Sequence, residues 1–258
     1  FNLPMSIITF ISDFGISDHY VSSVKASILK YNSNNTIIDI SHRVKKYDLS
    51  HAAYIFKNVF EEFPRGSVHI IAVKNYESSD KILLFQIDSH FIITFDSGII
   101  GLISSSDDIS AIEIDEKYNK IFPEKFMGEI ASKLASGINY TTIGKPISVF
   151  KRFLEKEVSI SKNKIVGYVI RVDSFGNIIT NISESDFNKV LKKNSGTFII
   201  NLGVDKISKI SNSYSDVGIA DLFAVFNFNK VLEIGMNGGG ASDLLGIKNH
   251  TPITIKFL

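Results

Sequence analysis

The sequence contains no cysteine and no tryptophan. Without cysteine the chain can form no disulfide, no thiolate nucleophile and no cysteine-based zinc site. No apolar run approaches the roughly 20 residues that a membrane-spanning helix needs. The 28 lysines and arginines nearly balance the 27 aspartates and glutamates, so the net charge of +1 predicts no strong attraction to nucleic acid or to a membrane surface.

The composition is that of a globular protein. Of the 258 residues, 44% are hydrophobic and 21% are charged, which is enough for two packed domains or one large one and argues against disorder. The four residues before Met5 lack the charged region and apolar stretch of a signal peptide. We therefore expect a natural start at Met5 and a cytoplasmic location.

Strand-like and helix-like segments alternate in the first half of the chain. Their order predicts an α/β domain over residues 5–148, with a largely parallel sheet and helices packed on it. Short apolar, β-branched runs predict the strands, and apolar residues at helical spacing predict the helices. The expected strands are 7–11, 36–40, 67–73, 82–87 and 91–94, and the expected helices are 20–29, 52–63 and 126–134.

The composition changes after residue 148. Residues 149–164 are charged and show little periodicity, so they are expected to link two domains. Short strand-like runs punctuated by Gly, Asn, Ser and Asp follow, which predicts a smaller all-β barrel domain over residues 165–258. The expected strands are 165–172, 177–182, 197–202, 222–225, 232–234 and 253–257.

Two carboxylates lie in a loop directly after the first expected strand. They belong to Asp13 and Asp18. In open α/β sheets, ligands bind in the crevice beyond the carboxyl ends of the strands, where a carboxylate can accept ribose hydroxyls or pair with an ammonium group. The alternative is purely structural, with Asp13 capping a turn and Asp18 capping the next helix.

A second polar cluster follows an expected strand of the C-terminal domain. Asp173, Phe175 and Asn177 place a carboxylate, an aromatic ring and an amide within five residues. Such a set could hold an amine, stack on a base and read its edge, although a hairpin corner would use similar residues. The glycine-rich run 237–242 could let backbone amides approach a ligand, or could be a flexible turn.

The six histidines show no pattern of a metal site or a catalytic triad. None pair at metal-ligand spacing on a helix, and no Ser-His-Asp order or G-x-S-x-G elbow stands out. His69 lies inside an apolar strand-like run. We expect it to be a hydrogen-bonded core residue.

Five segments, in order along nearly the whole chain, resemble one family. The most specific is 173–182, which matches D-x-F-G-N-x-x-T-N-I almost residue for residue. Residues 12–18 look like T-D-F-G-x-x-D, 38–53 look like D-x-(T/S)-H…D-I…A-A, and 64–69 look like P-x-G-(T/S)-V-H. Residues 232–242 resemble L-E-I…G-A-(A/S). This family is the S-adenosylmethionine (SAM) hydroxide adenosyltransferases, relatives of the SAM-dependent fluorinase and chlorinase.

The resemblance implies an N-terminal α/β domain, a C-terminal β-barrel and a homotrimer that binds SAM between the N-terminal domain of one subunit and the C-terminal domain of the next. SAM is the implied substrate or ligand, with no separate cofactor or metal and no nucleic acid or membrane partner. By position, Asp13 would hold the ribose hydroxyls, Phe175 and Asn177 the adenine. The implied substrate-binding set is Asp13, Asp18, Tyr47, Asp173, Phe175, Asn177, Asn227 and Gly238.

Other implied roles complete this picture of the bound substrate. Asp18 and Asp173 would face the methionine end, and Tyr47 stands where the family shields the reacting ribose carbon. Backbone near Gly238 would help to hold the adenine.

The chain departs from the family where the family orients or activates water. Lys74 replaces an aspartate, Lys81 replaces an arginine, and Phe122 lies nearest the position of a histidine. A lysine beside a sulfonium substrate repels it unless a carboxylate compensates. Phe122 can neither accept a proton nor donate a hydrogen bond. Glu77, Asp80 and Glu124 are nearby candidates for substitute carboxylates.

Three hypotheses follow. The chain could cleave SAM at the ribose C5′ with water, giving adenosine and methionine. It could bind SAM or adenosine without catalysis, as a sensor or carrier, or it could be a trimer with a vestigial cleft. The retained Asp13, Asp173 and Asn177 argue against the third hypothesis. We expect SAM cleavage as the family function, with inactive binding as the alternative.

Overall fold

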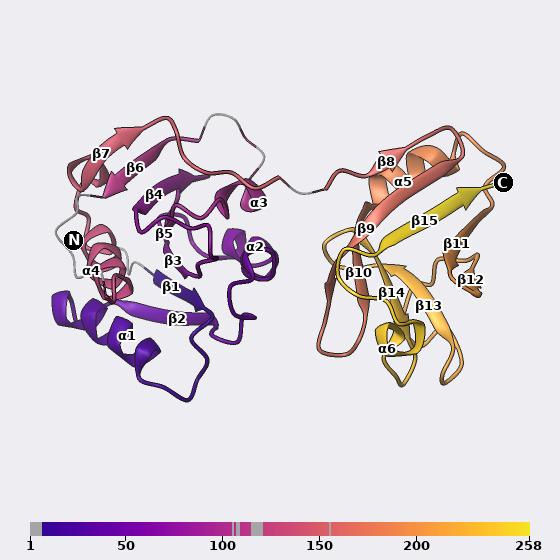
Figure 1. The fold of residues 1–258 in the computed structure, drawn as a ribbon, viewed down its shortest axis with the longest axis horizontal. Coiled ribbons are helices and arrows are strands. Elements are labelled where there is room, and N and C mark those ends of the chain that lie inside the picture. The colour runs from indigo at the N-terminus through magenta and orange to yellow at the C-terminus, as the bar shows by residue number, and fades with distance from the viewer. Residues whose placement is uncertain (1–6, 105, 107–108, 115–120, 155) are drawn as a thin grey trace. The chain divides into compact units, whose positions relative to one another are not determined.

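A computed structural model describes residues 7–104, 106, 109–114, 121–154 and 156–258. The chain forms two compact units, residues 1–155 and 156–258, and each has its own hydrophobic core (Figure 1). Met5, where we expect the natural start, lies outside the described residues. No helix in the described part of the chain is long and apolar enough to cross a membrane.

The N-terminal unit is built on a mixed sheet with the order β2-β1-β3-β5-β4-β6-β7. Neighbours in the run β2-β1-β3-β5 pair in parallel, whereas β4, β6 and β7 are added antiparallel. The α/β architecture with a mostly parallel sheet is therefore confirmed. The strands are β1 (Ile7–Ser12), β2 (Thr36–Ser41), β3 (Val68–Ala72), β4 (Ile82–Ile87), β5 (His90–Phe95), β6 (Ala111–Ile114) and β7 (Gly144–Ile147).

Helices cover both faces of this sheet. Because successive side chains of a strand point to opposite faces, each strand contributes to two cores. Ile8 and Phe10 of β1 belong to the core under α1 and α4, whereas Ile11 belongs to the core under α2 and α3. Both cores are continuous and apolar. The helices are α1 (Tyr20–Tyr31), α2 (Leu49–Lys57), η1 (Phe60–Glu62), α3 (Ile100–Ile103), α4 (Glu124–Ala135) and η2 (Tyr140–Thr142).

A glycine allows α1 and α4 to pack closely side by side (Figure 1). A Cβ atom on Gly128 would lie 2.3 Å from Ser27 Oγ and 2.9 Å from the carbonyl oxygen of Val24. The hydroxyl of Ser27 also donates to the carbonyl of Lys125, at 2.8 Å. This packing fixes the start of α4 near the carboxyl ends of the parallel strands.

The C-terminal unit is an antiparallel, nearly closed β-barrel, as predicted. Its strands run in the order β12-β11-β15-β9-β10-β14-β13, and β12 lies beside β13. Two short helices, α5 (Glu184–Leu191) and α6 (Ala241–Leu245), were not expected. The strands are β8 (Ser159–Ile160), β9 (Lys164–Val172), β10 (Ile178–Ser183), β11 (Phe198–Leu202), β12 (Asp205–Ile207), β13 (Leu222–Phe226), β14 (Val231–Met236) and β15 (Pro252–Phe257).

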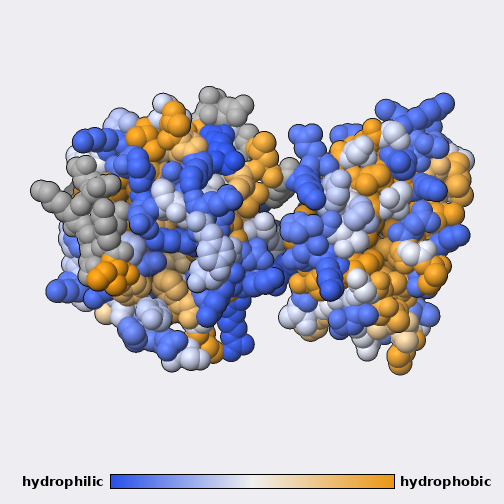
Figure 2. All heavy atoms as spheres, viewed as in Figure 1, coloured by the Kyte–Doolittle hydropathy of each residue, from blue (hydrophilic) through white to orange (hydrophobic). Residues whose placement is uncertain are grey.

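The segment between the units is partly attached to each. Phe150 and Phe153 pack against the core of the N-terminal unit, and the N–H of Phe153 donates to the carbonyl of Gly98 at 2.9 Å. Further along, β8 pairs with β9. On the face drawn in Figure 2, hydrophilic and hydrophobic residues are interspersed over both units.

Candidate functional site

The candidate site of the N-terminal unit lies beyond the carboxyl ends of two adjacent parallel strands. Ser12 ends β1 and pairs in register with Ala72, which ends β3. Asp13 and Lys74 therefore follow neighbouring strands and enter loops at the same edge of the sheet. This edge is where open α/β sheets bind ligands.

Asp13 is held by the loop that follows β2. The backbone N–H of Tyr47 donates to Asp13 Oδ2 at 3.0 Å. Burial raises the pKa of the Asp13 carboxyl, while the Tyr47 N–H and the charge of Lys46 act to lower it. A carboxylate has about four acceptor positions, so Asp13 retains capacity to accept ribose hydroxyls.

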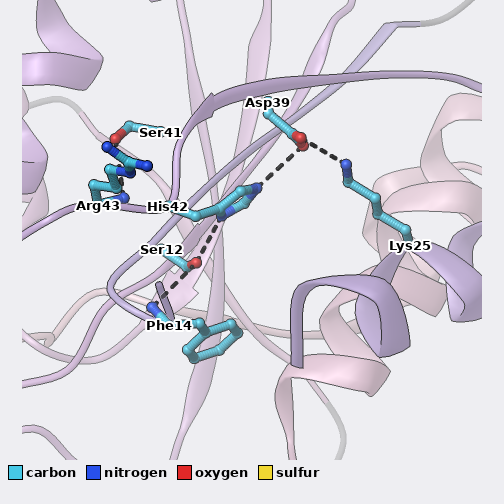
Figure 3. Close-up of polar contacts among 7 residues, drawn as sticks. All are labelled: Ser12, Phe14, Lys25, Asp39, Ser41, His42 and Arg43. Carbon is cyan, nitrogen blue, oxygen red and sulfur yellow. Dashed lines mark hydrogen bonds and ion pairs between the residues drawn. The ribbon is translucent and has the colours of Figure 1, made fainter. Parts of the chain in front are cut away.

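A chain of hydrogen-bonded polar side chains holds the end of β1, directly before Asp13 (Figure 3). Ser12 Oγ lies 2.7 Å from His42 Nδ1, and His42 Nε2 lies 3.1 Å from Asp39 Oδ1. Lys25 Nζ completes the chain, 2.6 Å from Asp39 Oδ2. The carbonyl of His42 also accepts the N–H of Gly15 at 2.8 Å. The sequence order gave no sign of this Ser-His-Asp arrangement.

The Ser-His-Asp arrangement positions the loop and does not present a nucleophile. Ser12 is fully buried, and no substrate carbon can reach its hydroxyl. Burial lowers the pKa of His42, while the nearby Asp39 carboxylate acts to raise it. The hydrogen bond to His42 satisfies the buried hydroxyl, which fixes the residue directly before Asp13.

Aromatic side chains line the same region. Phe122 packs against Phe14 and Tyr20, with ring centroids 6.2 and 5.7 Å apart, so an aromatic cluster occupies the position where the family has a histidine. Tyr47 packs on Tyr76 with centroids 4.8 Å apart. The contacts of Phe122 join the start of α4 to the loop after β1, and the Tyr47–Tyr76 contact joins the loops after β2 and β3. The hydrogen bond from Tyr47 to Asp13 links the two pairs.

The two lysines at the other family positions are both paired. Lys74 Nζ lies 2.9 Å from Asp80 Oδ1 and 4.1 Å from the centroid of the Phe95 ring. Lys81 Nζ lies 2.8 Å from Glu113 Oε2 on β6. The carboxylate of Asp80 therefore compensates the positive charge that Lys74 introduces at this position.

Asp18 lies apart from these contacts. It is exposed, and the N-cap position of α1 is held by His19 without a side-chain cap. The helix-capping alternative for Asp18 is therefore wrong. An aspartate does cap α2, because Asp48 accepts the N–H of His51 at 2.9 Å.

The C-terminal unit has a pocket of about 470 Å³. Three of the predicted residues, Phe175, Asn177 and Gly238, line it. Sequence reasoning missed Tyr214 and Phe223, whose rings pack in the same wall with centroids 5.1 Å apart. An aromatic within the polar run 212–216 was the available signal for Tyr214.

The carboxylate of Asp173 organises the turn that enters this pocket. Its Oδ1 accepts the backbone N–H groups of Phe175 and Asn177, at 2.8 and 2.9 Å, and its Oδ2 accepts Asn177 Nδ2 at 3.2 Å. Gly176 has a φ of +78°, and a Cβ atom there would lie 2.7 Å from the Cα of Gly240. The motif thus forms a hairpin corner that presents Phe175 and Asn177 to the pocket.

Two predicted residues of this unit, Asp173 and Asn227, do not line the pocket, and Asn227 lies away from it. The pocket is at the end of the β13–β14 hairpin where Leu222 pairs with Met236, and Asn227 follows the other end. Its Nδ2 donates to the buried Glu233 at 3.1 Å. The structure therefore gives Asn227 a turn-stabilising contact.

His69 is a core residue, as predicted. It is fully buried, its Nδ1 lies 2.7 Å from Thr9 Oγ1, and its Nε2 lies 3.0 Å from His90 Nδ1. Burial, with a contribution from the charge of His90, lowers the pKa of His69 to about 3. Elsewhere in the described residues, no group of three His, Asp or Glu side chains is arranged to hold a metal ion.

Family models match both units. The model of the SAM hydroxide adenosyltransferase N-terminal domain matches residues 8–144, and the model of the C-terminal domain matches residues 167–254. The chain belongs to the SAM hydroxide adenosyltransferase family. The resemblance carried by the motif at 173–182 is thereby confirmed.

Named relatives and a solved structure agree with the family assignment. The chain is 30% identical to an (R)-S-adenosyl-L-methionine hydrolase of Methanocaldococcus jannaschii, over 98% of this chain and 97% of the relative. It is 25% identical to a fluorinase of Nocardia brasiliensis, over 71% and 73%. A crystal structure of an uncharacterized conserved protein from Thermotoga maritima shares the fold, with a TM-score of 0.85 at 24% identity over 96% and 99%.

Proposed function

We propose that this adenosyltransferase family member hydrolyses SAM at the ribose C5′, giving adenosine and methionine. The observation that carries the proposal is the 30% identity with an (R)-SAM hydrolase over almost the full length of both chains. A second relative with that name, from Thermus thermophilus, is 23% identical over 97% of this chain. The names of both relatives favour the (R) epimer at sulfur as the substrate.

The protein has to orient the substrate more than to activate it, because methionine is already a good leaving group when its sulfur is a sulfonium. Water attacks C5′, the C5′–S bond breaks, and its electron pair stays on sulfur as the neutral thioether of methionine. In the proposed arrangement Asp13 accepts the ribose hydroxyls. Fixing the ribose in this way aligns C5′ with the attacking water.

The C-terminal pocket is proposed to take the adenine. Phe175 supplies a ring for stacking, and Asn177 an amide for the edge of the base. The proposal keeps Asp18 and Asp173 at the methionine end, Tyr47 beside the reacting carbon, and Asn227 and Gly238 in the substrate-binding set. It includes the homotrimer that the resemblance implies, with SAM at the subunit interface.

Binding without catalysis is the second candidate function. Its specific support is the aromatic packing of Phe122, which leaves no imidazole at the family's histidine position. Lys74 likewise carries an ammonium group where the family has a carboxylate. A sensor or carrier would need the nucleoside-binding residues and none of the water-activating ones.

One experiment separates these candidates. The protein is incubated with each sulfonium epimer of SAM, adenosine and methionine are followed by chromatography, and melting temperatures are measured with SAM and with adenosine. Equal amounts of adenosine and methionine above an Asp13→Ala control support hydrolysis. A rise in melting temperature without product supports binding alone. The absence of both would contradict the two candidates together.

A further inference from the structure

Glu124 is a carboxylate two residues after Phe122, which lies nearest the position of the family's histidine. It is the first residue of α4, directly after the aromatic Phe122 and the buried Pro123. The packing of Phe122 on Phe14 brings this start of α4 against the loop that carries Asp13. The start of α4 thus brings Glu124, which the sequence offered only as one of three candidate carboxylates, to the edge of the candidate site.

Burial and nearby charges shift the pKa of the Glu124 carboxyl. Burial raises its pKa, the ammonium of Lys74 acts to lower it, and the carboxylates of Asp13 and Asp80 act to raise it further. All three of these residues follow the carboxyl ends of β1 or β3. The start of α4 that carries Glu124 packs through Phe122 on Phe14, the residue directly after Asp13, with ring centroids 6.2 Å apart.

The other carboxylates of the site are less suited to accept a proton. Asp80 is paired with Lys74, and its side chain is 69% exposed. Asp13 is bound by the N–H of Tyr47 and is needed for the ribose in the proposed function. Glu77 is exposed to solvent. Glu124 is half-buried, and within the described residues no ion pair neutralises it.

We propose that Glu124 is the general base of this chain, which takes the proton of the water that attacks C5′. The inference rests on the proposed hydrolysis. In the step, the water oxygen forms a bond to C5′ as the C5′–S bond breaks, and the bonding electrons remain on sulfur. The water proton passes to the Glu124 carboxylate and then to solvent, so adenosine, methionine and one proton leave the site.

A raised pKa is useful for this role. A carboxylate with an ordinary pKa is a weak base near neutral pH, and proton transfer becomes more favourable as the pKa approaches the working pH. The positive charge of Lys74 stabilises the ionised form of Glu124 before the reaction. The lysine that replaces the family's aspartate acquires a function in this arrangement, since it keeps the substitute base ionised while Asp80 balances its own charge.

The test compares Glu124→Gln with a matched control on the same helix. Glu129→Gln removes an exposed carboxylate that pairs with Lys133 at 2.7 Å on the surface of α4. We expect Glu124→Gln to lower kcat by about 10²- to 10⁴-fold, with KM and the SAM-induced melting shift unchanged. Glu124→Asp should retain part of the rate, and Glu129→Gln all of it. The acidic limb of the pH–kcat profile should disappear in Glu124→Gln.

The outcomes distinguish this inference from the function on which it rests. Wild-type protein that forms no adenosine would overturn both. Wild-type protein that forms adenosine, together with a Glu124→Gln variant that keeps the same kcat and pH profile, would overturn only the role of Glu124. A Glu124→Gln variant that loses SAM binding and keeps kcat would also overturn it, because the carboxylate would then serve only to attract the cation.

Discussion

Lys74 Nζ lies 2.9 Å from Asp80 Oδ1, so a lysine that opposes a cationic substrate is paired with a carboxylate six residues further along the chain. The pair lies at the carboxyl edge of the parallel strands, beside Phe95. Its net charge is near zero, and a sulfonium can therefore approach.

Asp80→Asn should weaken SAM binding, because Lys74 would lose the carboxylate that pairs with it at 2.9 Å and would repel the sulfonium more strongly. We expect the Kd to rise about three- to tenfold at low salt, and less at high salt, where the repulsion is screened. Glu77→Gln, which removes an exposed carboxylate from the same loop, is the control. Isothermal titration at two salt concentrations measures both, and an unchanged Kd in Asp80→Asn would contradict the compensating role.

His42→Phe should lower both stability and nucleoside binding. The substitution keeps a ring but leaves the buried Ser12 hydroxyl without its partner, which costs about 1–3 kcal/mol. Urea unfolding measures the loss, with the exposed Arg43→Gln as control. The double variant Ser12→Ala/His42→Phe should recover part of the stability. A double variant less stable than His42→Phe alone would show that the hydrogen bond is not the cause.

Gly176→Ala should cost more than an alanine at another left-handed glycine. Gly196 has a φ of +82° with nothing within 4 Å of its Cβ position, whereas Gly176 at +78° would place a Cβ 2.7 Å from Gly240. Gly196→Ala then costs about 1–2 kcal/mol from backbone strain alone. Gly176→Ala should lose about 1–3 kcal/mol more from the clash, and should weaken adenosine binding. Equal losses in urea unfolding would refute the close approach.

The free energy of unfolding should fall as the pH falls from 6.5 toward 3. His69 has a pKa of about 3 in the folded chain and about 6.5 when unfolded, so in this window the unfolded state binds the proton. Its contribution is complete above pH 6.5 and declines by about 1.4 kcal/mol per pH unit below it. His69→Gln should flatten this dependence, and His19→Gln, at an exposed site, should not. Parallel slopes for wild type and His69→Gln would contradict the assignment.

Local sequence patterns were sufficient for the parts of the fold that are long and strongly apolar. The run that forms β1 and the helical spacing of α4 are examples, and the loop after β1 pointed to Asp13. The four-residue strand β7 was missed, because half of it is exposed and it contains Pro146. Helix α5 was missed because eight residues between strands give a weak periodic signal, despite the cap in which Ser183 accepts the N–H of Asp186 at 3.0 Å.

The contacts that complete the site depend on tertiary structure. Ser12 ends β1 and His42 follows β2, and only the parallel pairing of these strands brings the two side chains within 2.7 Å. Tyr214 reaches the C-terminal pocket from a polar loop whose sequence resembles an ordinary turn. The start of α4, with Glu124, lies beside the Asp13 loop because α4 packs on α1 and Phe122 packs on Phe14 at 6.2 Å. None of these distances is encoded in a local motif.

The most direct test of the account is hydrolysis of SAM in water labelled with oxygen-18, followed by mass spectrometry of both products. Attack of water at C5′ predicts adenosine that carries one heavy oxygen at its 5′ position, unlabelled methionine, and no such product from Asp13→Ala. Adenosine no more abundant than in the Asp13→Ala control, or adenosine without the label, would contradict the proposed reaction.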